Sequence, residues 1–162
     1  MTIQIFVTGG TLDKQYKETT GKLVFKKTHL PKMLKLGRAD LDVKIKTLMM
    51  LDSLQITDYH RNIILENCQK SQEDKIIIVH GSDTMAETAK FLGQRIKNKT
   101  IVLTGSMVPY SFESSDGMFN LGSALAFVQT LPYGVYVSMN GKNFYFDNVR
   151  KNKASGKFEK IK

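Results

Sequence analysis

The segment Lys75–Ile96, KIIIVHGSDTMAETAKFLGQRI, contains three successive kinds of sequence that together indicate the fold. Its first five residues are rich in isoleucine and valine, which is typical of a buried strand. A short loop of small and polar residues follows at His80–Thr84. Met85–Ile96 then has the length of a helix, and Thr84 with Glu87 predicts a capping box at its start. A strand joined to a helix by a short polar loop is the unit of a parallel α/β sheet.

The same alternation extends through the rest of the chain. Mostly β-branched apolar runs predict five strands, at Ile3–Val7, Val43–Leu51, Lys75–Val79, Thr100–Leu103 and Val135–Met139. Helical patterns predict four helices, at Leu30–Leu36, Asp58–Cys68, Met85–Ile96 and Met118–Leu131. Asn140-Gly141 is typical of a hairpin turn, so Lys142–Phe146 is expected to return antiparallel to the last strand. We therefore predict a three-layer α/β/α fold with a mostly parallel, twisted, Rossmann- or flavodoxin-like sheet and a C-terminal β-hairpin.

Length and charge predict one folded domain followed by a basic tail. The chain has 162 residues, of which 41% are hydrophobic and 24% charged, a composition that supports a single packed core. We expect this domain to cover residues 1–151 and residues 152–162 to form a flexible, basic tail. The net charge is +9, and six cations crowd the end of the chain: Arg150, Lys151, Lys153, Lys157, Lys160 and Lys162. This distribution favours a solvated tail over a nucleic-acid interface, which requires a basic stripe interleaved with exposed aromatic residues.

Several classes of protein are disfavoured by what the sequence contains. Cys68 is the single cysteine, so no disulfide can form within the chain. Met1–Val7 has no charged segment and is too short for a signal peptide, and no eighteen apolar residues are consecutive, so we expect a cytoplasmic protein without a membrane segment. The histidines His29, His60 and His80 do not have the spacing of metal ligands, and no nucleotide-binding glycine motif is present. We therefore expect neither a metal nor a cofactor.

Ligands of open α/β sheets bind at the carboxyl ends of the strands, and the loops predicted there are rich in glycine and hydroxyl groups. These loops are Thr8–Thr11, Asp52-Ser53, His80–Thr84 and Thr104–Met107. From the residues alone, the first and third of these loops each have two interpretations. Gly9-Gly10 suits a tight turn or a close approach of the backbone to a ligand. Ser82-Asp83 suits helix capping or a hydroxyl and carboxylate that act in catalysis.

In their order along the chain, these motifs resemble the N-terminal domain of the bacterial-type L-asparaginases. Thr8-Gly9-Gly10-Thr11 is similar to the first signature of that family, and His80–Met85 is similar to the second. Further similar segments are Asp52-Ser53 with Ile56-Thr57, Val102–Met107, Ser115–Gly117, Asn120-Leu121 and Met139-Asn140 through to Lys151. The resemblance therefore covers nearly the whole chain.

The resemblance implies a role for each matching residue. Thr11 would be the nucleophile that attacks a small, asparagine-like carboxamide and releases ammonia, without metal or cofactor. Ser82, Asp83 and Lys151 would relay protons, and Tyr16 would orient the nucleophile. The implied substrate-binding residues are Gly10, Ser53, Gly81, Ser82, Asp83 and Ser106. Members of the family form oligomers with their active sites at the contacts between subunits, so the resemblance also implies a homodimer.

Four features depart from the pattern of the family. Leu54 replaces a polar residue, and Ser82 replaces a threonine, which keeps the hydroxyl but frees its rotamer. The loop around Tyr16 is shorter, so Tyr16 is either the catalytic tyrosine or a surface aromatic. The C-terminal domain of the family, which supplies an acidic residue to the neighbouring subunit, has no counterpart in this sequence. These departures leave a second function open, that of a non-catalytic module that binds an amino acid or a related metabolite.

Overall fold

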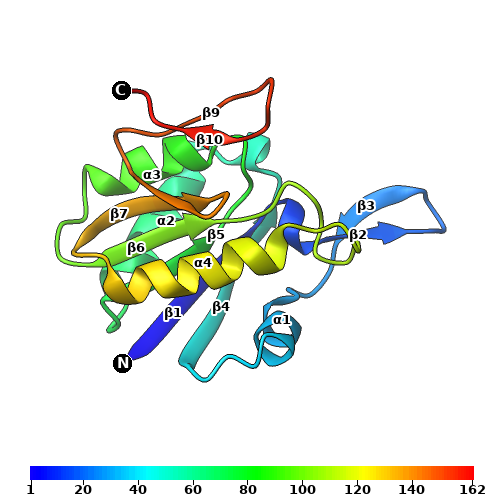
Figure 1. The fold of residues 1–162 in the computed structure, drawn as a ribbon, viewed down its shortest axis with the longest axis horizontal. Helices are drawn as coiled ribbons and strands as arrows, with labels where there is room; N and C mark the ends of the chain where they lie inside the picture. The colour runs from blue at the N-terminus through cyan, green and yellow to red at the C-terminus, as the bar shows by residue number, and fades with distance from the viewer.

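The computed structural model describes residues 1–162 and contains a six-stranded sheet between two layers of helices (Figure 1). The strands in chain order are β1 (Thr2–Gly9), β4 (Asp42–Leu51), β5 (Lys75–Val79), β6 (Thr100–Thr104), β7 (Gly134–Met139) and β8 (Lys142–Tyr145). Their order in the sheet is β4-β1-β5-β6-β7-β8. All neighbouring pairs are parallel except β7 and β8, which form the predicted hairpin with Met139 opposite Lys142. The predicted fold class is confirmed.

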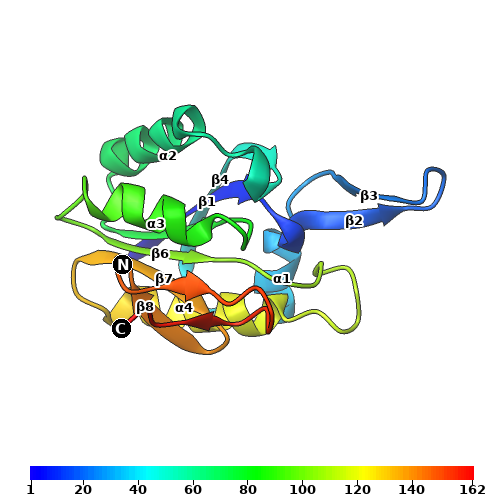
Figure 2. The same ribbon diagram turned by 90° about the horizontal axis from the view of Figure 1, so that it is seen from above.

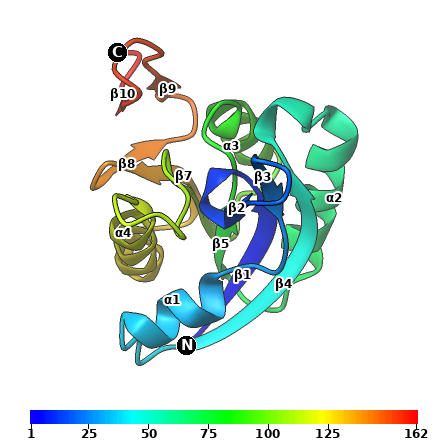
Figure 3. The same cartoon turned by 90° about the vertical axis from the view of Figure 1, so that its right-hand side faces the viewer.

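The helices cover both faces of the sheet, as Figure 3 shows along the strands. They are α1 (Leu30–Leu36), α2 (Asp58–Lys70), α3 (Met85–Gly93) and α4 (Gly117–Thr130). Ile76 and Ile78 of β5 point into the core under α2 and α3, whereas Ile77 and Val79 point into the core under α1 and α4. Both cores consist of buried apolar side chains, and each fully buried aliphatic side chain contributes about 1.5–3 kcal/mol relative to an exposed one. No helix combines the length and the apolar character that a bilayer crossing requires.

Helix α3 differs in two details from its sequence-based prediction. It ends at Gly93 instead of Ile96. A Cβ atom on Gly93 would lie 2.2 Å from the ring of Phe146, so the absence of a side chain on Gly93 allows that ring to pack against the helix. The predicted capping box is wrong. Thr84 occupies the N-cap position, but its hydroxyl donates to the carbonyl of Ser53 at 2.8 Å, and Glu87 pairs with Arg61 at 3.1 Å. Both side chains thus interact with residues distant in sequence instead of forming the capping box.

A second sheet, absent from the sequence-based prediction, projects from the body directly after the first candidate loop (Figure 2). The short 3₁₀ helix η1 (Thr11–Asp13) leads into the antiparallel strands β2 (Lys14–Lys17) and β3 (Lys22–Phe25). Asp13 closes the base of this hairpin, because its Oδ1 accepts the backbone N–H of His29 at 2.8 Å. Burial raises the pKa of the Asp13 carboxyl, and the His29 hydrogen bond partly opposes that shift.

The C-terminal segment is folded where the sequence-based prediction has a flexible tail from residue 152. Strands β9 (Arg150–Lys151) and β10 (Phe158–Glu159) pair antiparallel, with Lys151 opposite Phe158. Phe158 is only 4% exposed and belongs to the same core cluster as Val149. One aromatic side chain in a basic stretch is therefore enough to dock the segment, since its burial outweighs the solvation preference of the lysines around it.

Candidate active site

Three loops meet at the carboxyl end of the parallel strands, and glycines allow their close contact. A Cβ atom on Gly10 would lie 2.5 Å from the backbone nitrogen of Gly81, and a Cβ atom on Gly81 would lie 2.6 Å from the Cβ of Ser53. Gly10 has φ of +82°, which L-residues with side chains rarely adopt. The structure therefore brings together the loops after β1, β4 and β5, as the sequence predicts for this edge of the sheet.

Thr11 and Ser82 each follow one of the two glycines in contact. Thr11 begins η1 and is partly exposed, while Ser82 is buried in the loop before α3. Since Gly10 packs directly on Gly81, Thr11 and Ser82 lie in neighbouring loops at the same edge of the sheet. Ser53 is buried at the start of the 3₁₀ helix η2 (Ser53–Gln55) and contacts Gly81 with its side chain.

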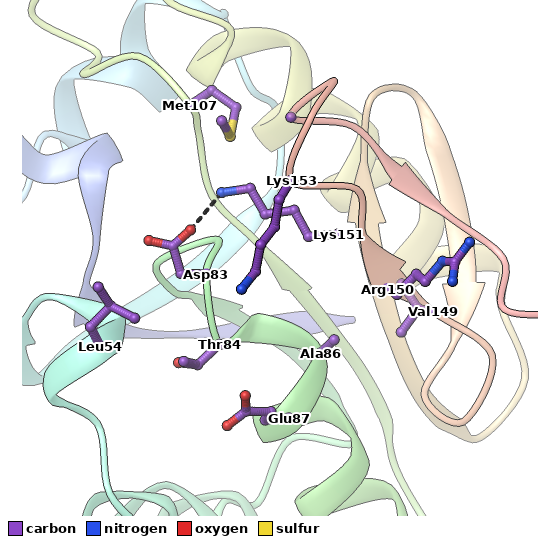
Figure 4. A pocket seen from close by; sticks show the side chains of 11 residues that line it. Leu54, Asp83, Thr84, Ala86, Glu87, Met107, Val149, Arg150, Lys151 and Lys153 are labelled. Atoms are coloured by element: carbon purple, nitrogen blue, oxygen red, sulfur yellow. Dashed lines mark hydrogen bonds and ion pairs between the residues drawn. The ribbon is translucent and has the colours of Figure 1, made fainter.

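Lys151 reaches this edge from the C-terminal segment and contacts two of the other predicted residues, Ser82 and Asp83. Figure 4 shows its contact with Asp83. Its Nζ donates to Ser82 Oγ and to Asp83 Oδ1, both at 2.7 Å. The Lys151 side chain is 14% exposed and that of Asp83 is 53% exposed. A pair with one solvated partner contributes about 0.2–1 kcal/mol to stability, so its main consequence is to fix the ammonium group between a hydroxyl and a carboxylate.

The Ser82 hydroxyl has a weak second partner. Its Oγ accepts the hydrogen bond from Lys151 and donates to Met107 Sδ at 3.5 Å. A thioether sulfur is a poor acceptor, so turning the Ser82 proton toward another group costs little. Met107 comes from the loop after β6, and its contact with Ser82 was not predicted from the sequence because methionine carries no signal of an acceptor role.

A buried network of hydrogen bonds supports the loop that carries Ser82 and Asp83. Burial lowers the pKa of His80 to about 4, so its imidazole is neutral near pH 7. The Nδ1–H donates to the carbonyl of Gly81 at 2.7 Å, and Nε2 accepts from Thr88 Oγ at 2.9 Å. Arg61 in turn donates to Thr88 Oγ at 3.1 Å. His80 thus lies packed at the end of its strand and has hydrogen-bond partners on both ring nitrogens.

Two of the predicted site residues do not face this group. Ser106 is 1% exposed, and its hydroxyl donates to the carbonyl of Val108 at 2.7 Å. Tyr16 is 58% exposed on β2, and its hydroxyl lies 3.9 Å from the position of a Cβ atom on Gly21 in the same hairpin. Tyr16 therefore has the placement of a surface aromatic in this conformation, and contact with Thr11 would require the hairpin to move.

A cleft of about 590 Å³ lies beside the ion pair of Lys151 and Asp83. It is lined by Leu54, Asp83, Thr84, Ala86, Glu87, Met107, Val149, Arg150, Lys151, Lys153 and Gly156. Its volume falls within the range of small-molecule sites, roughly 300–1,000 Å³. Leu54 is 76% exposed and presents an apolar side chain to this cleft. The side chains of Lys151 and Lys153 both extend toward the loop of Asp83 and Thr84 (Figure 4).

A family model described as asparaginase, N-terminal, matches residues 2–159. This chain belongs to the asparaginase family. Similar asparaginases include the L-asparaginase of Thermococcus kodakarensis, which is 31% identical over 147 residues, covering 88% of this chain and 45% of that protein. L-asparaginase 1 of Escherichia coli K12 is 30% identical over 155 residues, covering 90% of this chain and 44% of that protein. This chain spans about half the length of these relatives.

Solved asparaginase structures have the same fold over nearly the whole chain. The thermostable L-asparaginase from Thermococcus kodakarensis superposes with a TM-score of 0.87 at 28% identity and covers 99% of this chain, which spans 51% of it. A probable cytoplasmic L-asparaginase from Campylobacter jejuni gives a TM-score of 0.79 at 30% identity, with 92% of this chain and 49% of that chain covered. The asparaginase domain thus extends through β10, which includes the segment predicted as a tail.

The asparaginase domain has no group of three or more His, Cys, Asp or Glu side chains arranged to hold a metal ion. Cys68 lies in the core between α2 and the sheet, where burial raises the pKa of its thiol to about 12. The groups that meet at the candidate site are hydroxyls, a carboxylate, an amine and backbone N–H groups.

Proposed function

We propose that this chain is an amidohydrolase that hydrolyses a small, asparagine-like carboxamide to the acid and ammonia through a threonine nucleophile. The observation that carries the proposal is the position of Lys151, whose ammonium group donates to Ser82 and Asp83 at 2.7 Å. These groups lie in the loop that follows Gly81, against which the Gly10-Thr11 turn packs. The proposed nucleophile, the proposed hydroxyl relay and the lysine thus lie on segments that meet at one edge of the sheet.

The proposed first step is attack of Thr11 Oγ on the amide carbon. A threonine hydroxyl is a weak nucleophile near neutral pH, and a positioned base contributes about 10²–10⁴-fold. Lys151 becomes that base after it gives up the proton that it now donates to Asp83. Ser82 passes the Thr11 proton to Lys151 by turning its own hydroxyl away from Met107. Backbone N–H groups near Gly81 and Ser82 stabilise the oxyanion.

The tetrahedral intermediate then collapses. The C–N bond breaks, Lys151 returns the proton to the leaving nitrogen, and ammonia departs from the acyl-enzyme. Water attacks the ester carbon with Lys151 again as the base, which releases the acid and restores the Thr11 hydroxyl. Each half-reaction transfers protons through the same lysine, so a neutral isostere at this position should slow both half-reactions.

The substrate's backbone groups have candidate partners in the same loops. Asp83 uses Oδ1 for Lys151, which leaves Oδ2 to accept an α-ammonium group. Ser53 is proposed to bind the α-carboxylate. Gly10 and Gly81 are proposed to let the protein backbone approach the substrate closely. Ser106 and Tyr16 belong to the proposed set on the strength of the resemblance, and their roles require movement of the loops that carry them.

The test is ammonia release from a panel of asparagine, glutamine and simpler carboxamides. We expect Thr11→Ala and Lys151→Met each to lower kcat by about 10²–10⁴-fold. Lys153→Met is the matched control, because Lys153 lines the same cleft but makes no hydrogen bond to Ser82 or Asp83. A Thr11→Ala variant with full activity would rule out the proposed nucleophile.

The non-catalytic alternative is favoured by one observation, the exposed Leu54 in the cleft. An apolar side chain there offers no hydrogen bond to a polar substrate. If the unmutated chain binds aspartate tightly in calorimetry and releases no ammonia from any amide, the site is a metabolite-binding module.

We further propose a homodimer and a cytoplasmic location. The exposed side chains of Phe112 and Phe119 support an apolar contact between copies, and sedimentation velocity tests it. The likeness to the probable cytoplasmic enzyme of Campylobacter jejuni supports the location, and cell fractionation tests that.

A further inference from the structure

Lys151 is attached to the molecule through a short segment. Its strand β9 has two residues, and so does its partner β10, where Phe158 lies opposite Lys151. A ladder of this length has too few hydrogen bonds to be stable alone. The position of the Lys151 backbone therefore depends on Val149, which is buried in the core two residues before it, and on what holds β10 against the body of the molecule.

Asn140 provides a directional connection between β10 and the sheet. Its Oδ1 accepts the backbone N–H of Phe158 at 3.0 Å. Burial of the Phe158 ring attracts the segment to the core without fixing its orientation, because apolar contacts are not directional. The hydrogen bond that the Phe158 N–H donates to Asn140 fixes the register of Phe158 and, through the ladder, that of Lys151.

Asn140 is itself held by a buried residue. Its backbone N–H donates to Asn120 Oδ1 at 3.2 Å, and Asn120 is 1% exposed on α4. The Asn120 amide also donates to the carbonyl of Gly105 at 2.9 Å and to Asp116 Oδ2 at 3.0 Å. Asp116 accepts the backbone N–H of Met107 at 3.0 Å. One continuous set of hydrogen bonds thus links the loop that carries Met107 to the strand that faces Lys151.

We propose that Asn140 is a positioning residue that places the Lys151 amine on Ser82 and Asp83, acting through Phe158 and supported by Asn120. Its catalytic consequence rests on the proposed function, whereas its structural consequence does not. Asn140 has φ of +57° at the hairpin turn, a conformation that asparagine, aspartate and glycine tolerate. The position therefore combines a backbone requirement with a side-chain acceptor.

Two substitutions separate these requirements. Asn140→Gly keeps the left-handed backbone and removes the acceptor, and Asn140→Asp keeps both. Asn148→Ala is the matched control, because Asn148 Oδ1 accepts the backbone N–H groups of Ile161 and Lys162 beyond β10 and not that of Phe158. Each full-length variant is compared by amide hydrogen exchange at Phe158, by the rate at which formaldehyde and borohydride methylate Lys151, and by kcat and KM for ammonia release.

We expect Asn140→Gly to accelerate exchange at Phe158 and methylation of Lys151 and to lower kcat by about 10–100-fold, since a displacement near 1 Å at a reacting group has effects of this size. KM should change by less than about 3-fold, because substrate-binding groups on the other loops stay in place. Asn140→Asp should restore all three readouts, and Asn148→Ala should leave them unchanged. Exchange at Ile77 in the central strand β5 reports global unfolding and should be unaffected.

Unchanged Phe158 exchange and Lys151 methylation in Asn140→Gly would overturn the inference, as would an Asn140→Asp variant that behaves like Asn140→Gly. Equal acceleration at Phe158 and Ile77 would also overturn it, since the defect would then be global. If the unmutated chain releases no ammonia while Asn140→Gly still alters exchange and methylation, the proposed activity fails and the positioning role stands.

Discussion

Two short, two-stranded sheets lie outside the main sheet of this molecule, and each carries a residue predicted to act in catalysis. The β9–β10 pair carries Lys151, which reaches Ser82 and Asp83. The β2–β3 hairpin carries Tyr16, which is exposed and stays within its own hairpin. The first pair has a buried aromatic residue, Phe158, and a side-chain hydrogen bond to the turn after β7, whereas the hairpin is held at its base, where Asp13 accepts a hydrogen bond and Lys14 forms an ion pair. Attachment, more than strand length, decides which residue is delivered to the site.

The strongest test of this comparison removes the anchor of the C-terminal pair. Phe158→Ala should lower the free energy of unfolding by about 3–5 kcal/mol, the usual cost of truncating a buried phenylalanine. Tyr16→Ala on the exposed hairpin should change it by less than about 0.5 kcal/mol. Urea unfolding followed by circular dichroism measures both, and similar losses for the two variants would remove the distinction between the sheets.

The sequence predicts the centre of the main sheet because strands β1, β5, β6 and β7 are buried on both faces. Ile76–Val79 is apolar at every position, and such runs identify strands in parallel sheets. The glycine and hydroxyl motifs that follow these runs likewise predict where Gly10, Ser53 and Gly81 meet, since the ends of parallel strands lie at one edge.

The two outer sheets escape prediction for different physical reasons. Lys14–Lys17 is a largely solvated strand without a buried face, so it lacks the hydrophobic alternation that marks strands. The stretch around Phe158 contains a single core residue among lysines, and a single apolar residue cannot form the periodic hydrophobic pattern from which strands are predicted. In the same way, Thr84 carries a local capping signal, but the carbonyl of Ser53, distant in sequence, accepts its hydrogen bond.

The loop that receives Lys151 should have a characteristic acid response through His80. Its pKa is about 4 in the folded chain and 6.5 when unperturbed, so the unfolded chain binds the proton first as pH falls. The free energy of unfolding should therefore decrease between pH 6.5 and 4, by up to about 3 kcal/mol from this residue. Urea titrations across this range should show a shallower decrease for His80→Asn.

The base of the hairpin should respond to pH with the opposite sign. Burial raises the pKa of Asp13 above 3.8, so the folded chain binds a proton more readily than the unfolded chain. Relative to Asp13→Asn, the unmutated protein should lose stability as pH rises through the window above 3.8. Asp13→Ala, which leaves the His29 N–H without its acceptor, should cost about 1–3 kcal/mol at pH 3.5 and less as the pH rises through that window. A constant difference between the unmutated protein and Asp13→Asn from pH 3.5 to 7 would contradict this assignment.

The smallest expected effect concerns the tip of the hairpin, where Lys17 lies directly opposite Lys22. Like charges at facing positions oppose strand pairing, so Lys17→Glu should stabilise the hairpin by about 0.2–1 kcal/mol. The gain should appear as slower amide exchange in β2 and β3 at low salt and should shrink at 1 M salt, where charges are screened within about 3 Å. Exchange at Phe158 should not change, because the two outer sheets are attached independently. A variant that slows exchange in both sheets would show instead that they are coupled across the site.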